Sequence, residues 1–182
     1  MPDTTPKNTP PRRSGYAKIQ AEYVAAYRDC KRLKRAYGGN SQRCVVAYEL
    51  RRRGYDVTAR PLLARNDVVV KNWNRLFIDQ KFVDVGSEDA KTAIANLEAE
   101  IANYGDGSRS VVFVIWRGGC NRAHVFIVER QHGKARYVDP QSGTVDYEDW
   151  KSKFVPVSLK VSRVDDKKVD TQYLLQVVRE GQ

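Results

Sequence analysis

Hydrophobic residues in the first part of the chain recur at steps of three and four, the spacing typical of amphipathic helices. This pattern predicts helices over about residues 16–37, 41–53 and 87–104. Gly54 follows the second helix as its stop signal, and Ser41 or Asn40 is its candidate cap. Ser87 is the candidate cap of the third helix, with acidic residues in the first turn. The expected buried stripes are Tyr16, Ile19, Tyr23, Tyr27, Cys30 and Leu33; Cys44, Val45, Ala47 and Tyr48; and Ala90, Ile94, Leu97 and Ile101.

From residue 109 onward the hydrophobic period becomes that of strands. Strands are predicted at residues 55–59, 110–116, 123–130, 135–138 and 157–161, and short helices at 147–154 and 169–180. His132-Gly133 predicts a hairpin turn, and residues 139–143 predict another turn. Helices first and antiparallel strands later indicate an α+β fold, with N-terminal helices packed on an antiparallel sheet.

Residues 1–14 have a different composition, with four of the seven prolines and almost no apolar side chain. They predict a disordered, basic, proline-rich arm. The expected organisation is this arm, an N-terminal helix over 15–39 and one domain over 40–182. No apolar run reaches the roughly 18 residues of a membrane span, and the N-terminal stretch lacks the apolar segment of a secretory signal. A cytoplasmic protein, one exported by another route and one packaged in a virus particle all fit.

The net charge of +10 favours an anionic partner, either a nucleic acid or an acidic protein. The basic residues cluster at Lys31–Arg35 and Arg51–Arg53. The alternative is that these clusters are simply solvated faces of two helices. The chain has no basic motif interleaved with aromatic residues of the kind that binds RNA.

The three cysteines form neither a disulfide framework nor the paired spacing of a zinc site. Cys30 falls on an apolar stripe, which indicates packing. Cys120 lies in a predicted loop near His124, where it is either incidental or a second candidate for an exposed thiol. Cys44 lies in the first turn of a predicted helix, where the helix dipole stabilises a thiolate. It is therefore either a nucleophile or a small hydrophobic residue at the edge of a core.

A histidine and an aspartate are predicted to meet on one face of the sheet. If His132-Gly133 is a two-residue turn, Phe126 lies opposite Asp139, and His124 is its diagonal neighbour on the same face. An aspartate at that place can orient the imidazole of His124 while the other ring nitrogen faces a thiol. Cys44 with His124 and Asp139 is then a candidate cysteine-nucleophile site. Taken alone, the histidine fits a structural role, and Asp-Pro is a common turn opener.

Three segments together resemble the papain-fold toxin domain of the glutamine deamidase type, which occurs in bacterial polymorphic toxins and some phage head proteins. The segments are NSQRCVVAYELRRRGYDVTA, SVVFVIWRGG and AHVFIVERQHGKARYVDPQSG, within a resemblance that spans about residues 40–166. The resemblance implies a papain-like α+β fold. It also implies a Cys-His-Asp triad that converts a protein glutamine to glutamate, without a metal or organic cofactor.

The chain departs from the family pattern beside both proposed catalytic groups. The family reads Asn-Cys-x-x-Cys, and here Ser41 replaces the first cysteine while Cys44 keeps the second. The family reads Gly-His-x-Phe-Asn, and here Ala123 replaces the glycine and Ile127 the asparagine. The nucleophile position is therefore either 44 or 41, and a serine at position 41 would be nearly inert in a site tuned for a thiol.

Two functions follow as hypotheses. The first is a cysteine amidohydrolase, a toxin or effector that deamidates glutamine on a protein substrate. In this hypothesis Gln141 lines the site and an immunity protein is a further partner. Proteolysis and acyl transfer are alternative reactions that use the same triad. The second is a catalytically silent papain-like domain used for structure or binding, for example in a virion. A plain nucleic-acid binder is a third reading, which salt dependence would test.

Overall fold

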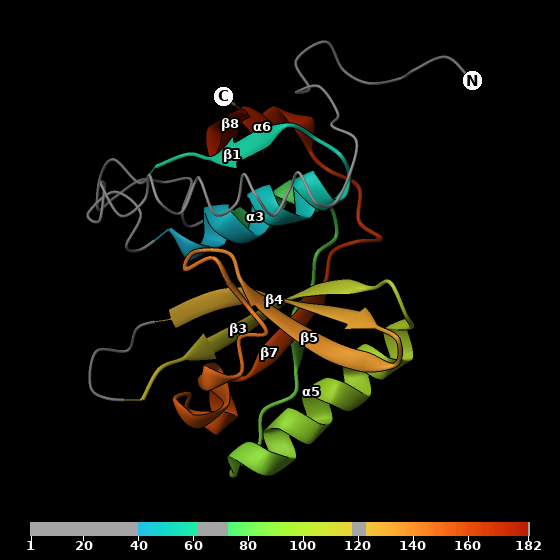
Figure 1. Cartoon of the computed structure of the whole chain (residues 1–182), viewed down its shortest axis with the longest axis vertical. Coiled ribbons are helices and arrows are strands. Elements are labelled where there is room, and N and C mark those ends of the chain that lie inside the picture. The colour runs from blue at the N-terminus through green and yellow to red at the C-terminus, as the bar shows by residue number, and fades with distance from the viewer. Residues whose placement is uncertain (1–39, 62–72, 118–122, 182) are drawn as a thin grey trace. The chain divides into compact units, whose positions relative to one another are not determined.

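The computed structural model describes residues 40–61, 73–117 and 123–181 (Figure 1). The predicted arm over 1–14, the helix over 16–37, the cluster Lys31–Arg35 and the thiols of Cys30 and Cys120 lie outside these residues. The chain divides into two compact units. One extends to Ile78 and resumes at Lys168, and the other is Asp79–Lys167. We call them the helix unit and the sheet unit.

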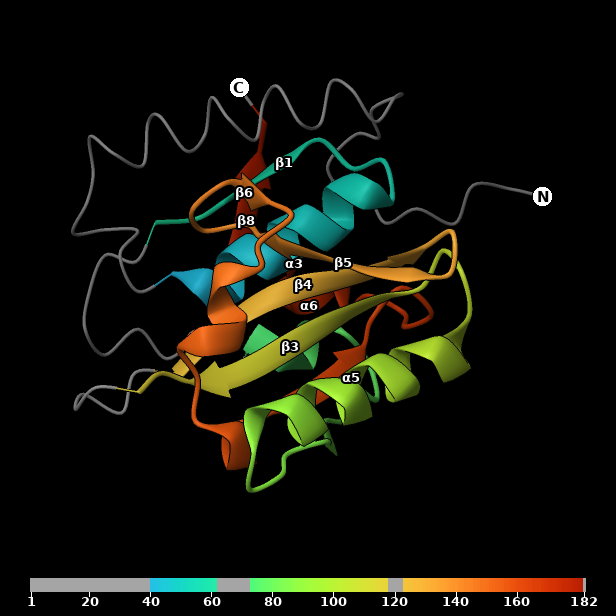
Figure 2. The ribbon, with the colours of Figure 1, turned by 60° about the horizontal axis from the view of Figure 1, so that its bottom comes forward.

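The helix unit is built around the second predicted helix. Its elements are α3 (Ser41–Arg52), β1 (Val57–Ala59), η1 (Trp73–Leu76), α6 (Thr171–Val177) and β8 (Val178–Glu180). Helix α3 agrees with the prediction, and Gly54 after it has a φ of 89°, a conformation that glycine adopts without strain. Strands β1 and β8 pair antiparallel, with Thr58 opposite Arg179 (Figures 1 and 2).

Helix α3 is buried on nearly all sides, whereas the sequence predicted a single apolar face. Polar side chains of this helix are buried as well, and Glu49 and Arg51 are buried with a partner. Glu49 is 0% exposed and pairs with Arg53 one turn later at 2.8 Å. The guanidinium of Arg51 donates to the carbonyl of Val57 on the neighbouring strand. Hydrogen bonds of this kind offset the cost of taking a charged group out of water.

The sheet unit is a six-stranded antiparallel sheet with one long helix on its face (Figures 1 and 2). Its strands follow the order β2-β7-β3-β4-β5-β6. They are β2 (Val83–Asp84), β3 (Arg109–Ile115), β4 (Ala123–Gln131), β5 (Lys134–Asp139), β6 (Thr144–Val145) and β7 (Lys160–Arg163), and the helix is α5 (Ala90–Tyr104). The predicted hairpin at His132-Gly133 is confirmed, since both residues have positive φ, as a two-residue turn requires.

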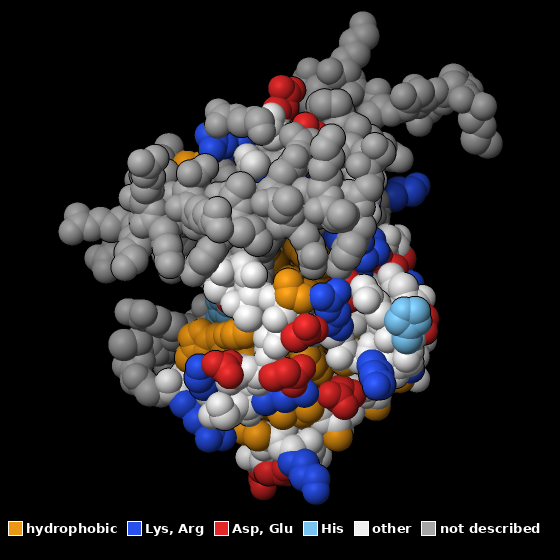
Figure 3. Space-filling model, viewed as in Figure 1, with side chains coloured by type: hydrophobic (Ala, Val, Ile, Leu, Met, Phe, Trp, Pro, Cys, Tyr) orange, Lys and Arg blue, Asp and Glu red, His pale blue; other side chains and the backbone are white. Residues whose placement is uncertain are grey.

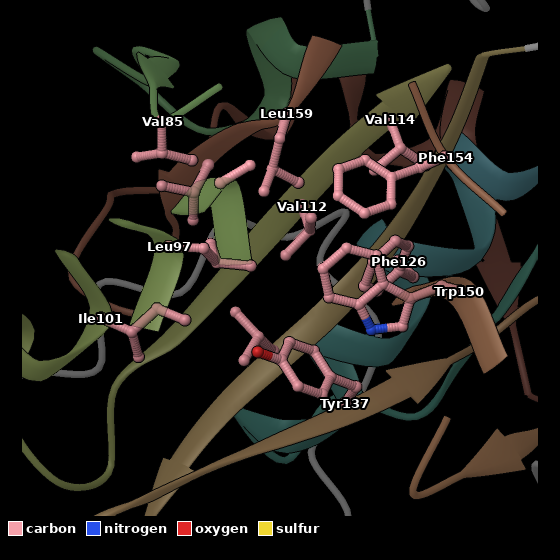
Figure 4. Packing of buried hydrophobic residues seen from close by; sticks show 13 residues of the cluster. Val85, Leu97, Ile101, Val112, Val114, Phe126, Tyr137, Trp150, Phe154 and Leu159 are labelled. Carbon is pink, nitrogen blue, oxygen red and sulfur yellow. The ribbon is translucent and has the colours of Figure 1, made fainter. Parts of the chain in front are cut away.

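The core of the sheet unit lies between α5 and one face of the sheet (Figure 4). It consists of aliphatic side chains beside a group of aromatic rings in tilted and edge-to-face contact, with Trp150 between Phe126 and Tyr137 at centroid distances of 5.1 and 5.2 Å. Ala93, Leu97 and Ile101 form the buried stripe of α5, and Ala90 and Ile94 lie at its margin. Acidic and basic side chains intermingle on the outside of this unit (Figure 3).

Four predictions about local structure were wrong. Asp89, not Ser87, caps α5: its carboxylate accepts a hydrogen bond from the N–H of Thr92 at 2.8 Å, and the first turn carries no acidic residue. Helices are not confined to the N-terminal part, because α5 and α6 follow strands. The segment predicted as a final helix is helical only to residue 177. It continues as strand β8, which pairs antiparallel with β1 through backbone hydrogen bonds. The strand predicted at 157–161 begins only at Lys160, because Pro156 starts the short 3₁₀-helix η3 (Pro156–Ser158).

The core packing predicts a large effect for a single substitution. Leu97 is 0% exposed, so we expect Leu97→Ala to lower the free energy of unfolding by about 2–5 kcal/mol. Lys91→Ala on the exposed side of the same helix is the matched control, with an effect below about 0.5 kcal/mol. Urea unfolding of both variants measures the difference. Equal stabilities would contradict the assignment of this face to the core.

Candidate active site

His124 lies near the start of β4, on the face of the sheet that carries the core. The ladder places it directly opposite Val114 of β3. Its side chain is 11% exposed, so the ring is largely shielded from water. Two aromatic rings flank it: Trp116 stacks on the imidazole at 5.4 Å and Phe126 at 6.1 Å. The ring is therefore held in one plane by its neighbours.

Asp139 at the end of β5 completes a pair with this histidine. The register of β4 and β5 is the predicted one, with Ile127 opposite Val138 and Val128 opposite Tyr137. The diagonal relation between His124 and Asp139 follows, and the structure brings Nε2 of the imidazole within 3.3 Å of Oδ2 of the carboxylate. Because Nε2 faces the carboxylate, Nδ1 is the ring nitrogen left for other chemistry.

The turn after β5 fixes the carboxylate of Asp139. The backbone N–H of Gln141 donates to Oδ1 at 3.0 Å, and the hydroxyl of Ser142 donates to Oδ2 at 2.9 Å. The carbonyl of Asp139 also accepts from Gly143 at 2.9 Å, which closes the turn. Turn formation and orientation of the histidine are thus two tasks of one side chain. Gln141 contributes its backbone here, and a role for its side chain stays a prediction.

Two aromatic residues near the pair were missed from the sequence. Trp116 could have been found by extending the ladder, since it lies two residues beyond Val114 on the same face as His124. Tyr147 was assigned to a short helix predicted at residues 147–154, whereas the 3₁₀-helix found there covers only Asp149–Ser152. Burial, and then the negative charge of Asp139, raise the pKa of Tyr147 to about 12. Its phenol is therefore neutral near pH 7 and cannot serve as a general base there.

The two candidate nucleophile positions lie at the start of α3, in the helix unit. Ser41 is the first residue of the helix, and its side chain is buried. Cys44 is the fourth residue, 8% exposed, and its N–H already donates to the carbonyl of Asn40 at 3.1 Å. The N–H groups of residues 41–43 have no partner within the helix, as in the first turn of any helix. The N–H groups around position 41 therefore lie outside the helix ladder, whereas the N–H of Cys44 belongs to it.

The start of α3 is anchored to the segment that follows β1. Asn40 stands at the cap position without capping the helix, and its Nδ2 instead donates to the carbonyl of Arg60 at 2.6 Å. The buried guanidinium of Arg43 donates to the carbonyl of Pro61. Arg60 in turn is tied to the C-terminal segment through its N–H, which donates to the carbonyl of Val177 at 2.9 Å. Position 41 is thus held by contacts with distant parts of the chain.

Two residues of the predicted basic cluster Arg51–Arg53 act within the fold. Arg51 is buried beside β1, and Arg53 pairs with Glu49 and lies over the ring of Phe77 at 5.5 Å. Among the described residues, no group of three His, Cys, Asp or Glu side chains could hold a metal ion. No helix in the described part of the chain is long and apolar enough to cross a membrane.

The sequence of this chain matches that of a known protein family. The family described as papain fold toxin 1, glutamine deamidase, matches residues 39–144, more than half of the 182 residues. The chain belongs to this family. A search of curated proteins found no relative.

Membership in the papain-fold glutamine deamidase family confirms the resemblance inferred from the sequence, and with it the α+β fold class. The matched stretch contains every candidate catalytic residue, from Ser41 to Asp139. The structure brings His124 and Asp139 together in the sheet unit. Ser41 and Cys44 belong to the helix unit.

Proposed function

We propose that this chain carries the site of a cysteine-type protein-glutamine deamidase in which α3 supplies the nucleophile position, His124 the base and Asp139 the orienting group. The observation that carries the proposal is the 3.3 Å pair between His124 Nε2 and the turn-anchored carboxylate of Asp139. That pair fixes the imidazole with Nδ1 free, as a base for a thiol requires. Family membership supplies the reaction type.

Helix geometry favours position 41 over position 44 as the nucleophile position. A tetrahedral intermediate develops negative charge on oxygen, and backbone N–H donors beside the nucleophile stabilise it. The first turn of α3 offers such donors around residue 41, whereas the N–H of Cys44 is used in the helix ladder. The proposed steps are attack of a thiolate on Cδ of the glutamine side chain and loss of ammonia, which takes a proton from His124. Water, deprotonated by His124, then hydrolyses the thioester to give glutamate.

The same geometry favours a second candidate function for the chain as it stands. Ser41 occupies the favoured position, and a serine hydroxyl is nearly inert where a thiolate is required. A catalytically silent domain used for binding or structure, for example in a virion, would then keep the fold without the reaction. A protein substrate, an immunity protein and an anionic partner remain predictions for one function or the other. Within the predicted basic clusters, Lys31–Arg35 is the better candidate for that partner, because Arg51 is buried and Arg53 is paired with Glu49.

A proteome-wide assay tests the proposal without knowledge of the target. A cell lysate is incubated in ¹⁸O-labelled water with the chain, with Ser41→Cys, or with Ser41→Cys/His124→Ala, and glutamines converted to ¹⁸O-glutamate are identified by mass spectrometry. We expect conversion at specific glutamines with Ser41→Cys and none with the double variant. Conversion by the unaltered chain that Cys44→Ala abolishes would assign the nucleophile to Cys44. The absence of conversion in every protein would favour the silent domain.

A further inference from the structure

Asn40 is buried at the start of α3, and one half of its carboxamide is unused. The residue is 1% exposed, and Nδ2 donates to the carbonyl of Arg60 at 2.6 Å. Oδ1 is fully shielded and has no hydrogen-bond donor among the described residues. Asparagine at a helix start usually caps the first turn, yet this side chain makes no capping bond.

The unpaired atom is an oxygen, and not a nitrogen placed there by an amide flip. Exchanging the two ends of the carboxamide would bring Oδ1 against the carbonyl oxygen of Arg60, two acceptors in contact. Nearly all buried polar atoms in native proteins have a partner, because leaving one unpaired costs free energy. A buried acceptor beside the proposed nucleophile position therefore fits a ligand that brings an N–H donor.

We infer that Asn40 Oδ1 accepts a hydrogen bond from the NH₂ group of the substrate's glutamine side chain and selects a primary carboxamide over a carboxylate or an ester. The inference rests on the proposed function and adds a specificity residue to it. A primary carboxamide carries two N–H donors, whereas the glutamate product carries none and presents negative oxygens to Oδ1. Asn40 thus favours binding of the substrate and release of the product.

The same contact strengthens during the reaction. As the departing nitrogen is protonated, it gains positive charge and donates more strongly to Oδ1. An interaction that strengthens toward the transition state raises the rate of C–N cleavage as well as binding. A methyl ester of the same side chain has oxygen in place of NH₂ and offers Oδ1 no donor.

The test compares an amide with its ester in the Ser41→Cys protein. The substrates are an N-blocked glutaminyl peptide, followed by ammonia release, and the matching glutamyl γ-methyl ester, followed by methanol release. We expect Asn40→Ala to lower kcat/KM for the amide by about tenfold and to change that for the ester by less than about twofold. Asn96→Ala is the matched control, since Asn96 also donates through Nδ2 to a backbone carbonyl, that of Val85, at 3.3 Å. We expect this control to leave the amide-to-ester ratio unchanged.

The ratio is independent of the fraction of protein that folds, because unfolded molecules hydrolyse neither substrate. Asn40→Gly provides a second variant, since glycine is well tolerated at a helix cap. Equal losses on amide and ester in both variants would overturn the inference and leave the proposed function standing. Failure of Ser41→Cys to hydrolyse either substrate would overturn the proposed function, and the inference with it.

Discussion

Ser41→Cys should raise the rate of glutamine deamidation by this chain on the order of 10³-fold or more. The substitution places a thiol at the first residue of α3, where the helix dipole favours the thiolate and N–H groups outside the helix ladder can hold an oxyanion. The change from hydroxyl to thiol adds little volume, so the helix should be preserved. Ammonia release from a susceptible protein or glutaminyl peptide measures the gain.

Cys44→Ala in the Ser41→Cys protein is the control for this gain. Cys44 lies one turn further along α3 with its N–H bonded to Asn40, and the account gives it a packing role. We expect the doubly substituted protein to keep its activity within about threefold, with a loss of stability of about 1–2 kcal/mol from the small cavity. Loss of all activity in this protein would instead identify Cys44 as the nucleophile.

The second large effect is expected from Asp139→Asn in the same Ser41→Cys background. Asparagine keeps the shape of the side chain, and its Oδ1 can still accept from the N–H of Gln141. Its Nδ2 then replaces the oxygen that faces His124 Nε2 at 3.3 Å, so a donor faces the ring where an acceptor stood. This arrangement favours the wrong tautomer of the imidazole, and we expect kcat to fall by about 10²–10⁴.

Ser142→Ala is the matched control for Asp139→Asn. It removes the 2.9 Å hydrogen bond to the same carboxylate oxygen but leaves the charge and the acceptor in place. We expect a loss of only about two- to tenfold from the looser orientation of Asp139. If Asp139→Asn retained full activity, Asp139 would be only a turn residue, and His124 would need another orienting group.

Local signals predicted the parts of the fold that depend on neighbouring residues. The hairpin at His132-Gly133 follows from two residues that tolerate positive φ, and the hairpin alone sets the register of β4 and β5. The diagonal relation of His124 and Asp139 is a consequence of that register, which explains why the pair could be inferred without a structure. Helix α3 was predictable for the same reason, since Gly54 stops it locally.

The wrong predictions concern segments whose conformation depends on distant partners. The residues of β8 were predicted to be helical from their sequence pattern. They form a strand because β1, more than a hundred residues earlier, provides an antiparallel partner for backbone hydrogen bonds. The burial of Arg43 and Glu49 could not be read from the pattern of α3, because their partners decide it. Trp116 and Tyr147 were missed at the site because neither lies in a motif, and only the assembled sheet brings them near His124 and Asp139.

The preference for position 41 over position 44 in the proposed site rests on the hydrogen bonding at the start of α3. From the sequence, both lie in one predicted first turn and both fit a family position. The structure separates them, because residue 41 begins α3 while the N–H of Cys44 is already in the ladder. The two positions differ in whether the backbone N–H is used in the helix, and the spacing of residue types in the family motif does not contain this information.

Cysteine alkylation tests most directly whether a nucleophile at the start of α3 is paired with His124. The rate of iodoacetamide alkylation of each cysteine is measured against pH by mass spectrometry. The proteins compared are Ser41→Cys and Ser41→Cys/His124→Ala. If position 41 is paired with His124, we expect fast alkylation of the thiol at position 41 near pH 6. This fast alkylation should be lost in the double variant, and alkylation of Cys44 should be slow in both proteins. Alkylation at position 41 that follows a free-thiol pKa of about 8.5 whether or not His124 is present would contradict this pairing.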